Sequence, residues 1–465
     1  MNYLGIDIGT STISFILADE SGHVLKQMTL SNNAVIFSTR KTEYLQDPDV
    51  IVSAVSCTIE EISRQYRIDG IGVTGQMHGI LYVDENGNAC RSLYTWEDQR
   101  GNEFCQENLT YAELIREKTG YTVPTGYGAM SLFYDTVNGT VPEKAEKICT
   151  IVDYVAMKLG NLKSPVTHFS NAASLGLYDI RNSRFDFSAI EKAGIDCSLF
   201  PEICSERIIG YTEDGAAVSA GIGDNQASFF GSVSGKSRTL INIGTGSQIS
   251  VFSDKIISGT SLDCRPYING AYLLVGASLC GGRAYKILKD FFLSVIRMAA
   301  SEAEDNLYAL MDQQASLYTD TSLTVDSRFC GTRMNPSLRG SIQNISDQNF
   351  NAGSLSYATL KGICTELYEF YESVPEDLRR DKVLIGSGNG IRNSQVERKI
   401  IQKIFSKKLM IPECREEAAY GAALMALCNS GKKSLEQIQK MISYENADGT
   451  DMHEPRKKEQ SEQKS

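Results

Sequence analysis

Two aspartates in this chain each precede a short run of glycine, serine and threonine, a combination suited to phosphate chemistry. Asp7 ends an apolar run that leads into the sequence GTST at 9–12. Asp224 follows a small-residue turn, and the later β-rich run 239–243 leads into GTGS at 244–247. Glycine and hydroxyl residues at such turns let backbone N–H groups approach a phosphate closely. A nearby carboxylate can bind Mg²⁺ or accept a proton.

Either turn taken alone is equally consistent with an ordinary β-hairpin. The argument for phosphate binding rests on the repetition, because each run has the pattern strand, Gly/Thr/Ser turn, strand. A duplicated domain that holds the phosphates of ATP between its halves would explain both copies.

Two further segments have residues suited to binding a sugar. Gln76, Met77 and His78 lie between two glycines at the end of the apolar run 68–74. Trp96, the only tryptophan, is followed by Asp98 and Arg100, and sugars bind through an aromatic ring beside charged hydrogen-bonding groups. The alternatives are a turn with an exposed histidine, and a core tryptophan next to a surface ion pair.

A third glycine-rich turn, GSGNG at 386–390, lies between a predicted strand at 382–385 and a predicted helix at 394–405. Strand, glycine turn and helix in this order suit a nucleotide lying against the backbone. The sequence GSVSGKS at 231–237 resembles a P-loop, but it has three residues between its glycines where four are required, and it leads into a strand.

The remaining pattern predicts the elements that position these loops. Helices are expected at 47–67, 283–300, 302–317 and 355–374, and buried strands at 68–74 and 272–275. Residues 444–465 carry charges of both signs without an apolar period, which predicts a disordered tail.

Composition restricts the class of protein. At 465 residues the chain is long enough for two domains, and its 42% apolar and 22% charged residues are ordinary for a globular protein. A net charge of −11 argues against a nucleic-acid partner. We expect no membrane span and a cytoplasmic location. The twelve cysteines form no C-x-x-C pair, which predicts reduced core cysteines rather than zinc ligands.

Eight segments in order resemble the FGGY carbohydrate kinases: DIGTST, GQMHG, WEDQR, SNAAS, GDNQAS, NIGTGS, GSGNG and EEAAYGAAL. The resemblance covers residues 3 to about 430. It implies an α/β fold of two duplicated actin-like ATPase (ribonuclease H-like) domains with a cleft between them. We place the N-terminal domain at 1–234, which would bind sugar and phosphate, and the nucleotide-binding C-terminal domain at 235–443, followed by the tail at 444–465.

The resemblance also implies roles for individual residues. Asp224 would be the catalytic base, and Asp7 would hold Mg²⁺. The ATP phosphates would contact Thr10, Ser11, Thr12, Gly244, Thr245 and Gly246, and the adenosine would contact Gly386, Gly388 and Asn389. The sugar site would include Gln76, Met77, His78, Trp96, Asp98, Arg100, Asn171 and Asn225. Two segments depart from the pattern: GSGNG replaces three consecutive glycines, and His168 and Phe169 stand before SNAAS where many members have an aspartate.

The activity implied is transfer of the γ-phosphate of ATP to a terminal hydroxyl of a ketose, with sedoheptulose first and D-xylulose second. Other pentuloses and a non-catalytic sugar sensor on the same fold remain alternatives, although a sensor would need neither Asp7 nor Asp224. A chaperone or filament ATPase would have no use for GQMHG and WEDQR. The resemblance leaves a homodimer open.

Overall fold

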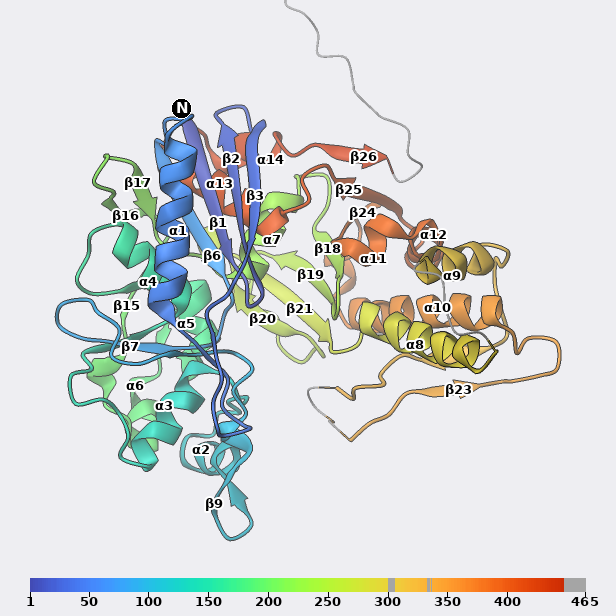
Figure 1. Ribbon diagram of the computed structural model, residues 1–465, viewed down its shortest axis with the longest axis horizontal. Helices are drawn as coiled ribbons and strands as arrows, with labels where there is room; N and C mark the ends of the chain where they lie inside the picture. The colour runs from blue at the N-terminus through green and yellow to red at the C-terminus, as the bar shows by residue number, and fades with distance from the viewer. Residues whose placement is uncertain (300–305, 333–334, 336, 447–465) are drawn as a thin grey trace, which may run out of the picture.

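Two twisted sheets with the same internal strand order form the framework of this protein (Figure 1). The computed structural model describes residues 1–299, 306–332, 335 and 337–446. The first sheet has the order β16-β17-β6-β1-β2-β3 and the second the order β20-β21-β19-β18-β24-β25-β26. We call each sheet with its surrounding helices a lobe.

The strands of the first sheet are β1 (Asn2–Ile8), β2 (Thr12–Asp19), β3 (Val24–Ser31), β6 (Gly70–Gly75), β16 (Ile208–Tyr211) and β17 (Ala217–Ser219). Those of the second are β18 (Thr239–Ile243), β19 (Ser247–Ser253), β20 (Asp263–Pro266), β21 (Tyr272–Ser278), β24 (Val383–Ser387), β25 (Lys408–Pro412) and β26 (Tyr444–Asn446).

Short strands complete the β structure: β4 (Val35–Ile36), β5 (Leu45–Gln46), β7 (Leu81–Val83), β8 (Leu93–Tyr94), β9 (Phe104–Gln106), β10 (Leu109–Thr110), β11 (Lys147–Cys149), β12 (Val166–His168), β13 (Tyr178–Asp179), β14 (Arg184–Phe185), β15 (Glu202–Cys204), β22 (Thr324–Asp326) and β23 (Ser341–Gln343).

The helices of the first half are α1 (Pro48–Ser63), α2 (Tyr111–Thr119), α3 (Gly128–Val137), α4 (Ile151–Leu159), α5 (Phe169–Leu175), α6 (Phe187–Ala193) and α7 (Asp224–Ser232). Those of the second half are α8 (Gly282–Ala299), α9 (Leu307–Ala315), α10 (Ala352–Glu372), α11 (Gly388–Asn393), α12 (Gln395–Phe405), α13 (Glu417–Asn429) and α14 (Leu435–Gln439).

The strand pairing confirms the predicted duplication. Strand β1 pairs antiparallel with β2 and parallel with β6, and β2 pairs antiparallel with β3. In the second lobe, β18 pairs antiparallel with β19 and parallel with β24, and β19 pairs antiparallel with β21. Each lobe then adds a further parallel strand, β17 beside β6 and β25 beside β24. The fold is therefore the expected α/β pair of actin-like domains.

Local sequence explains where the elements begin. Helix α1 starts at Pro48 after the N-cap Asp47, whose side chain accepts from the backbone N–H groups of Asp49 and Val50. It ends at Ser63, four residues earlier than expected. Helices α8, α10 and α12 lie close to their predicted ranges. Part of the predicted helix at 302–317 lies outside the described residues, and α9 covers its remainder.

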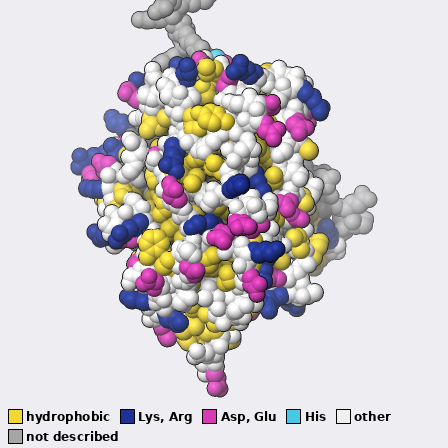
Figure 2. All heavy atoms as spheres, turned by 90° about the vertical axis from the view of Figure 1, so that its left-hand side faces the viewer, with side chains coloured by type: hydrophobic (Ala, Val, Ile, Leu, Met, Phe, Trp, Pro, Cys, Tyr) yellow, Lys and Arg dark blue, Asp and Glu magenta, His cyan; other side chains and the backbone are white. Residues whose placement is uncertain are grey.

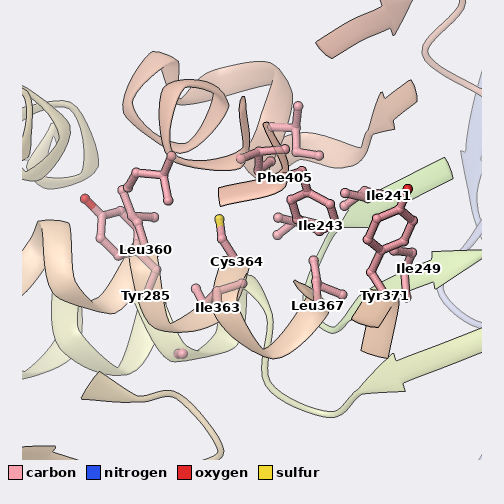
Figure 3. Close-up of a cluster of buried hydrophobic side chains, with 14 of the residues drawn as sticks. Ile241, Ile243, Ile249, Tyr285, Leu360, Ile363, Cys364, Leu367, Tyr371 and Phe405 are labelled. Carbon is pink, nitrogen blue, oxygen red and sulfur yellow. The ribbon is translucent and has the colours of Figure 1, made fainter. Parts of the chain in front are cut away.

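Each lobe has its own core, and a further core joins them. The second-lobe core packs α10 against β18 and β19, with Ile243, Leu367 and Phe405 among its side chains (Figure 3). The joining core combines side chains of both sheets with those of α7 and α13, which pack against each other. These two helices have equivalent places, because each follows the last parallel strand of its sheet.

The predicted tail begins too early. Tyr444 is in strand β26, which pairs antiparallel with β25. The Tyr444 hydroxyl donates to the carbonyl oxygen of Ser232 at 2.7 Å and accepts from the backbone N–H of Ser234 at 2.7 Å. The charged residues around Tyr444 made the whole segment resemble a disordered tail. The rest of the predicted tail, 447–465, lies outside the described residues.

Charges of both signs share the visible surface. On the face shown in Figure 2, lysine and arginine side chains are interspersed with aspartate and glutamate. Among the helices of the described ranges, none has the length and apolarity that crossing a membrane requires.

A buried carboxyl in the second lobe predicts a pH-dependent stability. Glu397, in the first turn of α12, is buried, and burial followed by the charge of Asp312 raises its pKa to about 8 from 4.5. A carboxyl with a raised pKa in the folded state binds its proton more tightly there than in the unfolded chain. The free energy of unfolding should therefore fall by a few kcal/mol, in order of magnitude, as pH rises from about 5 to about 8.

Glu397→Gln should flatten this dependence and make the protein more stable than the wild type above pH 8. The measurement is the thermal transition between pH 5 and 9, with Glu60→Gln on the exposed face of α1 as the matched control. The same slope in the wild type and in Glu397→Gln would contradict the assignment to Glu397.

Candidate active site

A cavity of about 510 Å³ receives side chains from both lobes. Of the residues predicted from the sequence, eight line it: Asp7, Thr10, Gln76, Met77, His78, Trp96, Asp224 and Asn225. The second lobe contributes Leu240, Asn242, Gln248, Ser250, Arg265 and the segment Arg415, Glu416, Glu417 and Ala418. The predicted sugar loops and the two aspartates therefore meet in one cavity.

The carboxyl groups of Asp7 and Asp224 come from different elements. Asp7 lies near the end of β1, and Asp224 is the first residue of α7, exposed to the cavity. Burial, followed by the charges of Asp224 and Glu416, raises the pKa of Asp7 to about 7. Negative charge thus converges where a cation would bind.

This donor set fits Mg²⁺, which usually keeps several waters and takes one or two carboxylates. Within the described ranges, no three His, Cys, Asp or Glu side chains are grouped as a complete metal cage. Asp7 is consequently the residue that could hold a hydrated magnesium ion, with Asp224 and Glu416 nearby.

The tip of the first hairpin is hydrogen-bonded to the predicted sugar loops. The indole N–H of Trp96 donates to Thr10 Oγ1 at 2.9 Å, and Thr10 Oγ1 donates to Gln76 Oε1 at 3.5 Å. The side chain of Gln46 donates to the Thr10 carbonyl oxygen at 2.8 Å. The predicted phosphate turn and the predicted sugar loop are therefore one hydrogen-bonded unit.

The loop of Gln76, Met77 and His78 is held in an unusual backbone geometry. Gly75 has a φ of 154°, and a Cβ there would lie 2.4 Å from the Ile8 carbonyl oxygen. His78 has a φ of 76°, which is uncommon for a residue with a side chain. Its ring stacks on Tyr127 at 4.1 Å, and its Nδ1 lies 2.8 Å from the Ser174 carbonyl oxygen. These contacts exclude the alternative of a merely exposed histidine in a turn.

The burial of the Trp96 segment rules out a core tryptophan beside a surface ion pair. Trp96 is 47% exposed, whereas Asp98 and Arg100 are only 1% and 2% exposed. Arg100 Nη2 lies 2.7 Å from Asp98 Oδ2, and its guanidinium stacks over the Tyr94 ring at 3.8 Å. Asp98 and Arg100 do not line the cavity, so this buried ion pair is placed to support the Trp96 loop.

The two predicted asparagines have different surroundings. Asn225 lines the cavity, and its Nδ2 donates to Ser250 Oγ at 2.9 Å. Within the described part of the chain its buried Oδ1 has no hydrogen-bond partner, so it is available to accept from a sugar hydroxyl. Asn171 is fully buried away from the cavity wall and donates to Gly221 O at 3.1 Å, which helps hold the turn before Asp224.

The tip of the second hairpin, residues 244–247, lies outside the cavity lining, as do Ser11 and Thr12. Its tip is held by the start of α8, since Gly282 N–H donates to the Gly244 carbonyl oxygen at 2.8 Å and Arg283 N–H donates to that of Thr245 at 2.9 Å. Gly246 does not have a positive φ; a Cβ there would lie 2.8 Å from the Ser278 carbonyl oxygen. Close approach therefore explains this glycine.

The GSGNG turn divides into a buried and an open part. Gly386 is buried in β24, where a Cβ would lie 2.8 Å from the Leu409 side chain, so packing explains this glycine. Gly388 has a φ of 86° and starts α11, and Asn389 is exposed. Gly388 and Asn389 are therefore accessible for a nucleotide, but neither lines the cavity.

Sequence reasoning missed the wall contributed by the second lobe. Gln248 and Ser250 alternate along β19, and a period of two after the hairpin would have placed them on one face. Arg265 lies on β20, the edge strand of the same sheet, and brings a guanidinium to the cavity. Its Nη2 atom lies 3.3 Å from Asp263 Oδ2. No local signal marked Arg265 or Arg415. They supply cationic groups that the glycine-rich loops themselves lack.

Comparison with known proteins agrees with this geometry. Residues 2–231 match the N-terminal domain, and residues 240–430 the C-terminal domain, of the FGGY family of carbohydrate kinases. The sedoheptulokinase of Mus musculus is 26% identical, over 91% of this chain and 97% of the relative.

Two solved structures from Lactobacillus acidophilus share the fold. A gluconate kinase has a TM-score of 0.82 and 20% identity, covering 96% of this chain and 92% of its own. A ligand-bound xylulose kinase has a TM-score of 0.80 and 19% identity, covering 96% and 93%. Because the two domain matches span most of the sequence, this protein belongs to the FGGY family of carbohydrate kinases, enzymes that use ATP as the phosphate donor.

Proposed function

We propose that this kinase phosphorylates a ketose at a terminal primary hydroxyl, with sedoheptulose the first candidate and D-xylulose the second. The observation that carries the proposal is the meeting of Asp224, Asp7 and the loop of Gln76, Met77 and His78 in one cavity. The similarity to mouse sedoheptulokinase supports the seven-carbon substrate.

In the proposed reaction, Asp224 accepts the proton of the attacking sugar hydroxyl as its oxygen bonds to the γ-phosphorus. Trp96 covers the CH face of the sugar, while the orphaned Oδ1 of Asn225 accepts a hydroxyl hydrogen bond. Asp98, Arg100 and Asn171 do not contact the sugar in this proposal. Asp98 and Arg100 support the Trp96 loop, and Asn171 holds the turn before Asp224.

Phosphate binding in the proposal uses the two hairpin tips, 9–12 and 244–246, with Gly388 and Asn389 beside the adenosine. Asp7 would hold Mg²⁺, which neutralises charge on the phosphates when bound. The hydrogen bonds from Trp96 and to Gln76 make the first tip respond to sugar binding, since the same two residues line the sugar cavity.

A second candidate substrate is an aldonate such as gluconate. The observation favouring it is Arg265, because a guanidinium in the cavity wall could pair with a carboxylate. The gluconate kinase from L. acidophilus shares the fold. An aldonate would still present a terminal hydroxyl to Asp224.

The test is ADP release with ATP and Mg²⁺ on a panel of sedoheptulose, D-xylulose, D-ribulose, D-fructose, D-gluconate and glycerol, read as kcat/KM. We expect sedoheptulose to be best, because a site built to bond hydroxyls rejects analogues that lack them, by up to about 10⁴–10⁵-fold. If gluconate were the best substrate, the proposed substrate would be an aldonate and not a ketose. If glycerol were the best substrate, both proposals would be contradicted.

Arg265→Met separates the two candidates further. For a ketose, loss of the guanidinium should cost about ten- to a hundredfold in kcat/KM, the scale of one hydrogen bond between a charged and a neutral group. For an aldonate the loss should be larger, because a carboxylate is oppositely charged and can pair with the guanidinium through two parallel hydrogen bonds. Asp254→Asn, on the exposed surface after β19, is the matched control.

A further inference from the structure

Two cysteines in the second lobe lie next to each other although fifty residues separate them in the sequence. Cys280 Sγ and Cys330 Sγ are 3.7 Å apart. Cys280 is in the loop between β21 and α8, and Cys330 follows β22. All twelve cysteines are free thiols, as predicted. Only four of them are buried and Cys57 is exposed, so the prediction that they are core residues holds for four of the twelve.

The two thiols differ in accessibility. Cys280 is fully buried, whereas Cys330 is half-buried and packs at the edge of the second-lobe core. Burial, followed by the neighbouring Cys330, raises the pKa of Cys280 to about 11. A reagent from solvent therefore meets Cys330 first, and Cys280 is placed behind it as the second thiol.

Both loops are already anchored on the same carboxyl group. Glu366 on α10 is buried, and its Oε2 accepts from Ser278 Oγ at 2.8 Å and from Ser327 Oγ at 3.5 Å. Ser278 Oγ also accepts from the backbone N–H of Cys280 at 3.2 Å. The two cysteines are thus held in neighbouring positions by hydrogen bonds within three residues of each.

The Cys280 loop also supports the second hairpin tip. At Gly281 a Cβ would lie 2.3 Å from the Gly246 carbonyl oxygen, so the two backbones are in direct contact. The next residue, Gly282, donates to the Gly244 carbonyl oxygen. A displacement of Cys280 is consequently transmitted to residues 244–246.

We propose that Cys280 and Cys330 form a dithiol modification site, which small disulfides such as oxidised glutathione convert to an intramolecular disulfide that weakens nucleotide binding. The part concerning nucleotide rests on the proposed phosphate role of residues 244–246. The sulfur atoms would approach from 3.7 Å to a bond length of about 2.05 Å.

The chemistry balances without another reactant. The Cys330 thiolate attacks one sulfur of the small disulfide, whose S–S bond breaks and releases one thiol. Cys280 then loses its proton to solvent and attacks the Cys330 sulfur of the mixed disulfide, displacing the second thiol. The protein loses two electrons and two protons, and the small disulfide is reduced to two thiols.

The test uses the full chain carrying Cys57→Ser, incubated with oxidised or reduced glutathione. Peptide mapping should find Cys280 joined to Cys330 only after oxidation, and dithiothreitol should reverse it. Titration calorimetry with Mg²⁺ and ADP should show affinity about fivefold or more weaker in the oxidised protein, the lower end of typical coupling between sites. Cys330→Ser in the same background should show neither change.

The outcomes separate the two parts of the proposal. A parallel incubation of the wild-type chain should form glutathione adducts on the exposed Cys57, which shows that the reagent reacts. If those adducts form but no Cys280–Cys330 peptide is found in either protein, the dithiol site is overturned. A mapped cross-link with unchanged ADP affinity would overturn the coupling to the hairpin. If the reduced protein failed to bind ADP, the nucleotide role would be contradicted, while the mapped cross-link would still support the dithiol site.

Discussion

Replacing Asp224 with asparagine should lower kcat by about 10²–10⁴, the range that a general base contributes. Asp224 begins α7, lines the cavity and accepts the backbone N–H of Asn225 through Oδ1. The asparagine side chain keeps the shape and one oxygen acceptor, so the helix start should persist. What it loses is the ability to take the hydroxyl proton.

The measurement is single-turnover phosphoryl transfer with the best sugar of the panel, together with ADP affinity and the thermal transition. Asp290→Asn on α8 is the matched control, because Asp290 is an exposed surface residue paired with Lys286. Turnover equal to that of the wild type would remove Asp224 from the role of base. A fall in ADP affinity of the same size would instead indicate damage to the nucleotide site.

Gly421→Ala should destabilise the protein by more than about 3 kcal/mol, the upper end of ordinary overpacking. Gly421 on α13 faces α7, where an added Cβ would lie 1.9 Å from the Ala227 carbonyl oxygen. Gly231 on α7 makes the reciprocal contact, with a Cβ position 2.2 Å from the Glu417 carbonyl oxygen. Backbone meets backbone at this crossing, so no side chain can rotate away.

The sign of this effect is not obvious from propensity, since alanine stabilises a helix by about 1 kcal/mol relative to glycine. We expect the steric cost to exceed that gain, lowering the melting temperature by about 3 °C or more, at roughly 1 °C per kcal/mol for a chain of 465 residues. Activity should fall with it, because α7 carries Asp224 at its first residue.

The control for this prediction is Gly235→Ala, since a Cβ at Gly235 would meet nothing nearer than Gln439 Oε1 at 3.8 Å. It should leave the melting temperature nearly unchanged. A stabilised Gly421→Ala variant would show that the two helices can separate without cost. The close helix crossing would then not be what holds the lobes in register.

Much of the fold could be predicted from the sequence because its signals are local. A strand that ends in GTST or GTGS has to turn, and the following β-rich run returns beside it, which is how β1-β2 and β18-β19 are built. The loop of Gln76, Met77 and His78 was visible for the same reason, since glycines mark both of its ends. Asp47 and Pro48 likewise marked the start of α1.

Local sequence signals predicted only part of the candidate site. Trp96 and Asp98 are two residues apart, yet one is 47% exposed and the other 1%. The alternative that their types left open, a core ring beside a surface ion pair, has the burial of the two residues reversed. Burial depends on which distant segments cover a residue: the ion pair of Asp98 and Arg100 lies against Tyr94 and Asp135, and the latter is on α3.

Local sequence determined the hairpins, the turns and the positions of Asp7 and Asp224 relative to them. The reason is that backbone geometry at a turn depends on a few neighbouring residues. Tertiary structure alone decided that Arg265, Gln248 and Glu416 face the same cavity as Asp7. It also decided that Tyr444 anchors a strand, and that Cys280 meets Cys330. The cavity forms when the duplicated sheets pack through α7 and α13, whereas Cys280 and Cys330 are brought together within the second lobe. Residues so far apart in the chain meet only in the folded protein, so the local sequence around either one does not reveal the contact.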